Sequence, residues 1–117
     1  MENVGKSTHI NVIMNEIVHR LKQLFGQNLR QVILFGSYAR GEQDDYSDMD
    51  IMVLVDIDDN ALKKYNNAIA ELVADISIKF RVLPSIIDKN YQHFQEWAPY
   101  LPFYHNVKTE GLEFYAN

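Results

Sequence analysis

Two aspartates, Asp48 and Asp50, are separated by a single residue at the start of an apolar run, residues 51–55. Alternate residues of a strand project to the same face, so both carboxylates should point the same way, roughly 6.6 Å apart at a rise of about 3.3 Å per residue. Like charges at that spacing repel unless a cation lies between them. Magnesium takes one or two carboxylates and fills its octahedron with water and substrate phosphates. The pair therefore predicts a Mg²⁺ site.

A second feature, the Gly36-Ser37 turn, follows another apolar run at residues 32–35. Glycine permits a tight turn and a close approach of backbone to a phosphate. A helix beginning at Ser37 would point free N–H groups and its positive end at an anion. Ser37 adds a hydroxyl donor, and Arg40 adds a guanidinium suited to phosphate oxygens. The turn predicts a binding site for a nucleoside triphosphate, and the polar segment 42–46 could fold it back beside the carboxylates.

Each half has a simpler explanation. Gly36-Ser37 could be an ordinary turn at a strand end, and the two aspartates could only make a strand start soluble. Gly, Ser, Asp and Asp at four set positions arise by chance in a chain of this length on the order of once in several hundred, given ordinary residue usage. The combination favours a site over two unrelated surface features.

Composition limits the other functions. The 117 residues are 47% hydrophobic, which predicts one domain, residues 1–117, with a substantial core. With no cysteine, neither a disulfide framework nor a thiolate zinc site can form, and we expect a cytoplasmic protein. The net charge of -5 argues against sequence-independent DNA binding. No run approaches the roughly 18 apolar residues of a membrane span, so we expect no membrane association.

Hydrophobic periodicity predicts the elements that position the site. Helical spacing covers residues 8–25 and a segment from Asp58 or Asp59 to residue 76. Buried strands are expected at residues 31–35 and 50–55, and a third strand at residues 79–86. Pro84 cannot donate a ladder hydrogen bond, so the third strand should lie at a sheet edge or break there. From Tyr91 onward the chain is rich in aromatic residues, with prolines interrupting a helical pattern. That segment either covers the sheet or presents a surface to a partner. The element order predicts an α/β (α+β) fold, a small mixed β-sheet with helices packed on it.

These residues resemble the DNA polymerase beta nucleotidyltransferase superfamily, and within it the minimal nucleotidyltransferase (MNT) domain of the MntA-like antitoxin branch. The family motif is Gly-Ser, ten residues, then Asp-x-Asp, and the chain reads Gly36-Ser37, residues 38–47, Asp48-Met49-Asp50. The resemblance implies the nucleotidyltransferase fold and a two-metal mechanism in which Asp48 and Asp50 are the catalytic, Mg²⁺-binding residues. ATP would be the nucleotide substrate, with Gly36, Ser37 and Arg40 binding it. An acceptor hydroxyl would attack the α-phosphorus, and pyrophosphate would leave.

One expected feature differs from the family pattern. Active members usually carry a third carboxylate on the next strand, and in the segment 79–84 the residue expected there is Arg81. A guanidinium neither ligates magnesium nor accepts a proton. Either Arg81 points into the site and alters the mechanism, or the predicted register is off by one residue and Arg81 is a surface charge.

The resemblance also implies a partner and an acceptor. Minimal nucleotidyltransferases are often encoded beside a HEPN-domain toxin and act as its antitoxin by adding AMP to a tyrosine, which is the activity we expect here. A small-molecule acceptor is an alternative, although relatives of that kind usually carry an added domain. The rival from another class is a catalytically degenerate module that binds nucleotide or partner without transfer. The nucleobase and the oligomeric state, a homo-oligomer included, stay open.

Overall fold

The computed structural model describes residues 2–117, with side chains described from His9 onward. In chain order the elements are α1 (Glu2–Phe25), η1 (Gly26–Asn28), β1 (Leu29–Phe35), α2 (Ser37–Arg40), β2 (Met49–Val55), η2 (Ala61–Tyr65), α3 (Asn66–Phe80), β3 (Pro84–Asn90), α4 (Tyr91–Trp97), α5 (Pro102–Glu110) and β4 (Leu112–Ala116). None of the described helices is long and apolar enough to cross a membrane.

The four strands form one mixed sheet in the order β3-β2-β1-β4. β1 pairs antiparallel with both β2 and β4, whereas β2 and β3 run parallel and are joined through α3. A parallel pair needs such a crossover because its second strand must start at the same end as the first. The α/β fold with a mixed sheet, expected from the element order, is confirmed.

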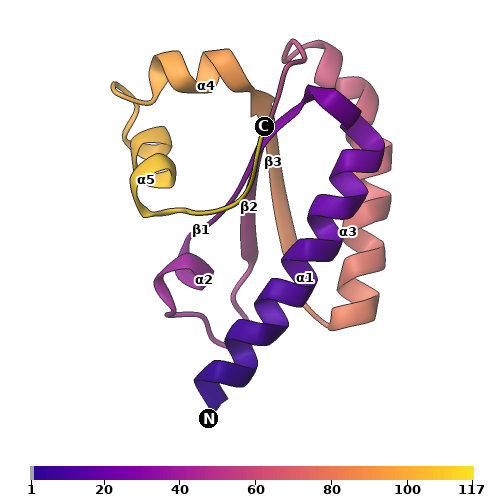
Figure 1. The fold of residues 1–117 in the computed structure, drawn as a ribbon, viewed down its shortest axis with the longest axis vertical. Coiled ribbons are helices and arrows are strands. Elements are labelled where there is room, and N and C mark those ends of the chain that lie inside the picture. Colours follow the sequence, from indigo (N-terminus) through magenta and orange to yellow (C-terminus); the bar gives the residue numbers. More distant parts are fainter. Residues whose placement is uncertain (1) are drawn as a thin grey trace.

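The sheet is covered on both faces (Figure 1). α1 and α3 lie on one face, and α4 and α5 lie on the other. Strand residues of the first face belong to a large core with α1 and α3: Leu29, Val32, Leu34, Met49, Ile51, Val53 and Val55. On the second face, Ile33, Met52 and Leu54 pack with Phe94 of α4 and Val107 of α5. β2 is therefore apolar on both faces, which explains its unbroken apolar run, and Asp50 shares a face with Met52.

The predicted strand at residues 79–86 is wrong in its bounds. Helical spacing continues through Ile76 to the last residue of α3, Phe80, and both pack into the first core. Arg81 caps that helix in the left-handed conformation at φ 56°, and its N–H donates to the Ser77 carbonyl at 2.9 Å. The strand begins only at Pro84 and lies at the sheet edge, so the edge position expected from the proline is confirmed.

The aromatic C-terminal segment is helical only in part. α4 and α5 appear where helices interrupted by prolines were expected, and Pro102 is the first residue of α5. β4, which pairs with β1 as the second edge of the sheet, was not expected from the sequence. Of its five residues only Phe114 and Tyr115 are half-buried, and the other three are exposed, so it carries little of the apolar pattern that marks a strand.

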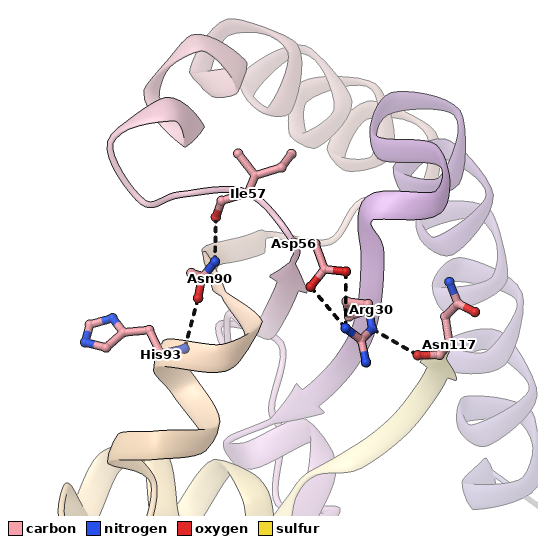
Figure 2. Close-up of polar contacts among 6 residues, drawn as sticks. All are labelled: Arg30, Asp56, Ile57, Asn90, His93 and Asn117. Carbon is pink, nitrogen blue, oxygen red and sulfur yellow. Dashed lines mark hydrogen bonds and ion pairs between the residues drawn. The ribbon is translucent and has the colours of Figure 1, made fainter.

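Polar contacts fasten the end of the sheet where β1 begins and β2 and β3 end (Figure 2). The Arg30 guanidinium donates to both carboxylate oxygens of Asp56, at 3.0 and 3.2 Å, and to the Asn117 carbonyl at 3.0 Å. The Asn90 side chain caps α4 by accepting from the His93 N–H at 2.9 Å and donates to the Ile57 carbonyl at 3.0 Å. These bonds hold α4 at the end of the sheet opposite to Asp50.

Candidate active site

The two aspartates lie at the end of the sheet where β2 begins. Asp48 immediately precedes the strand and is exposed, and Asp50 is its second residue and half-buried. Asp50 is paired with Phe35, the last residue of β1. Phe35 in turn contacts Phe103 of α5, with ring centroids 5.6 Å apart. The aspartate thus lies on the face of the sheet that carries α4 and α5, beyond the apolar core of that face.

Gly36 touches Asp50 closely. It adopts φ 74° and ψ -151°, a conformation that L side chains rarely adopt. A Cβ placed on Gly36 would lie 2.5 Å from the Asp50 Oδ2 atom. The backbone conformation therefore favours glycine at this position, and an added Cβ would also force the Asp50 carboxylate to move. The structure places the Gly36-Ser37 turn directly beside the second carboxylate.

Ser37 begins the short helix α2, which Gly41 ends in the left-handed conformation. The Gly36 carbonyl accepts from the N–H groups of Ala39 and Arg40, at 3.1 and 3.2 Å. The first N–H groups of any helix have no carbonyl partner within it. At α2 these belong to the turn that lies against Asp50.

Arg40, the third residue predicted to contact nucleotide, closes α2. Its exposed guanidinium donates to the Glu42 carboxylate at 3.3 Å. Its positive charge also acts on Asp50, where it lowers the pKa of the carboxyl group. Arg40 is therefore near enough to influence the carboxylate pair, and its ion pair with Glu42, exposed to solvent, holds it only weakly.

The Asp50 carboxyl group has a pKa raised above its ordinary value of 3.8. Burial is the largest cause, repulsion from Asp48 is the second, and Arg40 opposes both. The two aspartates therefore interact, as their spacing predicts. A cation bound between them would remove the repulsion.

In the acidic segment before β2, Asp44 has a structural role. Asp44 accepts hydrogen bonds from the Tyr46 N–H at 2.9 Å and from the Ser47 hydroxyl at 3.1 Å, while its own N–H donates to the Ser47 oxygen. Burial is the largest cause of the raised pKa of Tyr38, and the negative charges of Asp44 and Asp45 raise it further. Asp44 therefore shapes the turn that leads into the site.

The third position of the site belongs to Ser85, and the prediction of Arg81 there is wrong. In the parallel ladder Asp50 is paired with Ser85, and Met49 with Pro84. Paired residues of neighbouring strands share a face, so Ser85 lies beside Asp50. Arg81 precedes the strand, in the cap of α3. A signal for Ser85 was present: the apolar pair Ile86-Ile87 follows it as Ile51-Met52 follows Asp50.

The donor set fits a hard cation held jointly by protein and substrate. Within residues 9–117 no group of three His, Cys, Asp or Glu side chains is placed to hold a metal ion. Two carboxylates plus phosphate oxygens are a usual set for magnesium, which keeps several waters and seldom occupies an all-protein cage. The pair at Asp48 and Asp50 meets that requirement.

A hollow of about 500 Å³ is lined in part by residues of α2. Its lining includes Leu34, which belongs to the core under α1, together with Tyr38, Arg40 and Gln43. Leu34 and Asp50 point to opposite faces of the sheet. The hollow therefore lies on the opposite face of the sheet from Asp50, although Arg40 lines the hollow and also acts on Asp50.

Residues 14–101 match the nucleotidyltransferase domain family. Because that match covers most of the chain, the protein belongs to this family and is by class a nucleotidyltransferase. The fold and the Gly-Ser and Asp-x-Asp motif agree with that assignment.

Two relatives come from Methanocaldococcus jannaschii, and both are named as protein adenylyltransferases. MJ0604 is 30% identical over 105 residues, which cover 87% of this chain and 94% of the relative. MJ1305 is 49% identical over 45 residues, which are 38% of this chain and span only 31% of the relative.

Solved structures share the fold at lower identity. A toxin-antitoxin structure with AMP-PNP is 23% identical, covering 88% of this chain and 73% of that chain, at a TM-score of 0.56. A complex of tri-AMPylated Shewanella oneidensis HEPN toxin with MNT antitoxin is 21% identical, covering 91% of this chain and 71% of that chain, at a TM-score of 0.50.

Proposed function

We propose that this nucleotidyltransferase transfers AMP from ATP to a tyrosine hydroxyl of a HEPN-domain toxin, with Mg²⁺ held by Asp48 and Asp50, and so acts as an antitoxin. The observation that carries the proposal is the contact between Gly36 and Asp50. It supports the proposal because the turn proposed to bind phosphate and the carboxylate proposed to bind the cation lie side by side. A triphosphate could then be held by the turn and, through its cation, by the aspartates.

Each residue has a stated part. The first N–H groups of α2 and the Ser37 hydroxyl bind the terminal phosphates, and Gly36 leaves room for their approach. Arg40 exchanges its exposed partner Glu42 for a phosphate oxygen. Asp48 and Asp50 would hold Mg²⁺, which when bound neutralises the triphosphate and polarises the α-phosphate. The acceptor oxygen bonds to the α-phosphorus while the bond to the bridging oxygen breaks and pyrophosphate leaves.

The acceptor is supported by the relatives. Two of them are named as protein adenylyltransferases, and one structural neighbour is a complex in which an MNT antitoxin is bound to a tri-AMPylated HEPN toxin. This chain also exposes Trp97, Tyr100 and Phe103 on α4, α5 and their connection. Phe103 contacts Phe35 beside Asp50, so a protein that touched this surface would be close to the site.

The test is incubation of the chain with labelled ATP, Mg²⁺ and a HEPN-domain protein encoded beside it, followed by mass spectrometry of both proteins. We expect AMP on a tyrosine of the HEPN protein. Asp48→Asn and Asp50→Asn should abolish the transfer and weaken the binding of Mg²⁺ with nucleotide in calorimetry. Asp58→Asn is the matched control, because Asp58 is an exposed acid past the other end of β2. Equal transfer by all three variants would show that the carboxylate pair is not the site.

The rival function is nucleotide or partner binding without transfer. The observation that favours it is Ser85 in place of an acid beside Asp50. Such a module would bind a non-hydrolysable ATP analogue with Mg²⁺ but leave both proteins unmodified. Calorimetry and mass spectrometry on the same sample separate the two functions.

A further inference from the structure

We infer that Ser85 restricts this enzyme to acceptors with acidic hydroxyls, phenols above all, because no carboxylate of residues 9–117 stands where the acceptor loses its proton. The inference rests on the proposed function and adds to it the residue that selects the acceptor. It comes from the order of the strands at the site.

The strand order defines the direction of attack. Asp50 lies between the end of β1, with the Gly36-Ser37 turn, and the start of β3, with Ser85. Pyrophosphate leaves toward the turn that binds the terminal phosphates. In phosphoryl transfer the attacking and leaving oxygens lie roughly in line, on opposite sides of the phosphorus. The acceptor oxygen therefore approaches from the β3 side, next to Ser85.

No other described group on that side replaces a carboxylate. Asp88, the next acid along β3, is paired with Val53 and lies on the opposite face, under α1 and α3. Lys89 shares the face of Ser85 but is four residues further along, about 13 Å at the rise of a strand. Arg40 cannot accept a proton, and Asp48 and Asp50 would be occupied in holding the cation.

The chemistry then depends on the acceptor itself. The acceptor oxygen forms a bond to the α-phosphorus, the α-phosphorus to bridging oxygen bond breaks, and pyrophosphate takes the electron pair. The acceptor proton goes to water. A phenol, with a pKa of about 10, supplies the oxyanion far more readily than the much less acidic hydroxyl of serine. A general base usually raises the reaction rate by a factor of about 10²–10⁴. A phenol depends on this assistance less than an aliphatic hydroxyl does.

The experiment compares acceptors and variants. The HEPN partner is prepared with its acceptor tyrosine, with mono- and difluorotyrosine, and with serine at that position. We expect the parent to modify the fluorotyrosines faster than tyrosine, and serine slower by on the order of 10²-fold. Ser85→Asp should raise transfer to serine by on the order of 10²-fold and flatten the dependence on phenol acidity. Ser85→Asn introduces a side chain of the size of aspartate that accepts no proton. This variant should keep the acceptor preference of the parent.

A second readout is independent of transfer. With a non-hydrolysable ATP analogue, Ser85→Asp should bind Mn²⁺ more tightly in calorimetry or electron paramagnetic resonance, while Ser85→Asn should not. Asn67→Asp, which adds the same charge on α3 across the sheet, should leave Mn²⁺ binding unchanged.

The inference is overturned if the parent modifies serine as fast as tyrosine, a result that needs no variant. It is also overturned if Ser85→Asp folds and tightens Mn²⁺ binding yet keeps the acceptor preference. Failure of the proposed function looks different, because then the parent modifies no acceptor at all.

Discussion

Asp50, the residue proposed to bind the cation, is charged at a cost to the stability of the fold. Its raised pKa means that the folded protein disfavours the charged form, so stability falls as pH rises from the ordinary 3.8 through the raised value. We expect Asp50→Asn to unfold at higher denaturant concentration than the parent at neutral pH in EDTA. Well below 3.8 both carry a neutral side chain and the difference should vanish. A variant less stable than the parent at neutral pH would contradict this explanation.

The two glycines that flank α2 provide a matched comparison. Both have positive φ, 74° at Gly36 and 71° at Gly41, but an added Cβ meets Asp50 only at Gly36 and nothing within 4 Å at Gly41. Gly41→Ala should cost about 1–2 kcal/mol of stability and retain nucleotide binding. Gly36→Ala should lose nucleotide binding as well, because its methyl group displaces the Asp50 carboxylate. Denaturant unfolding and calorimetry with an ATP analogue measure the two effects, and equal nucleotide affinity would exclude the predicted role of the turn.

Gly36, Ser37, Asp48 and Asp50 can be recognised together in the sequence because their spacing is local and their residue types are chemically distinctive. The third position cannot, for a physical reason. Arg81 lies between the end of a helical pattern and Pro84. From the sequence, the strand could start either before Arg81 or at the proline. Only the pairing of β2 with β3 identifies Ser85 as the neighbour of Asp50.

At the scale of elements, apolar periodicity predicts those that bury a stripe or a whole strand. α1, β1, β2 and most of α3 carry such patterns, and the predicted bounds of β1 and β2 differ from the observed ones by one or two residues. The helix starts differ more: α1 begins at Glu2 and not at residue 8, and α3 begins at Asn66, after η2, and not at Asp58 or Asp59. β4 was missed because its partners are distant in sequence and most of its residues are exposed. Its strand conformation comes from the ladder with β1, which no local pattern reveals.

The start of α4 supports a prediction about capping. Asn90 both accepts from the His93 N–H and donates to the Ile57 carbonyl (Figure 2). Asn90→Ala should lower the free energy of unfolding by about 1–2 kcal/mol. Asn90→Ser keeps a cap but cannot reach Ile57, so it should recover about half of the loss. Denaturant unfolding measures both, and equal stability of the parent and the two variants would show that the contacts contribute nothing.

For the molecule as a whole, Arg30 connects several elements at the end of the sheet away from the site. Its guanidinium bonds to Asp56 after β2 and to the Asn117 carbonyl after β4, and lies 4.2 Å from the centroid of the Tyr91 ring at the start of α4. Arg30→Lys retains the charge but loses the planar guanidinium that bonds to Asp56 and Asn117 at once. The change should lower the free energy of unfolding by about 1–2 kcal/mol. Metal binding should be unchanged, because Arg30 lies at the other end of β1 from Gly36. Thermal unfolding and Mn²⁺ titration together check this, and a change in Mn²⁺ affinity would indicate coupling between the two ends of the sheet.

The position of β4 has a consequence for the order in which the chain folds. β1, β2 and β3 are joined by segments of moderate length, whereas β4 must return to pair Ala116 with Gln31 across most of the chain. Closing so long a loop carries a larger entropic cost, and contacts of this kind slow the search for the native state. The segment from α1 to β3 holds the motif and one complete core, and it can assemble before β4 joins. In pulse-labelled refolding, amides of β1 bonded to β2 should therefore gain protection from hydrogen exchange earlier than those bonded to β4.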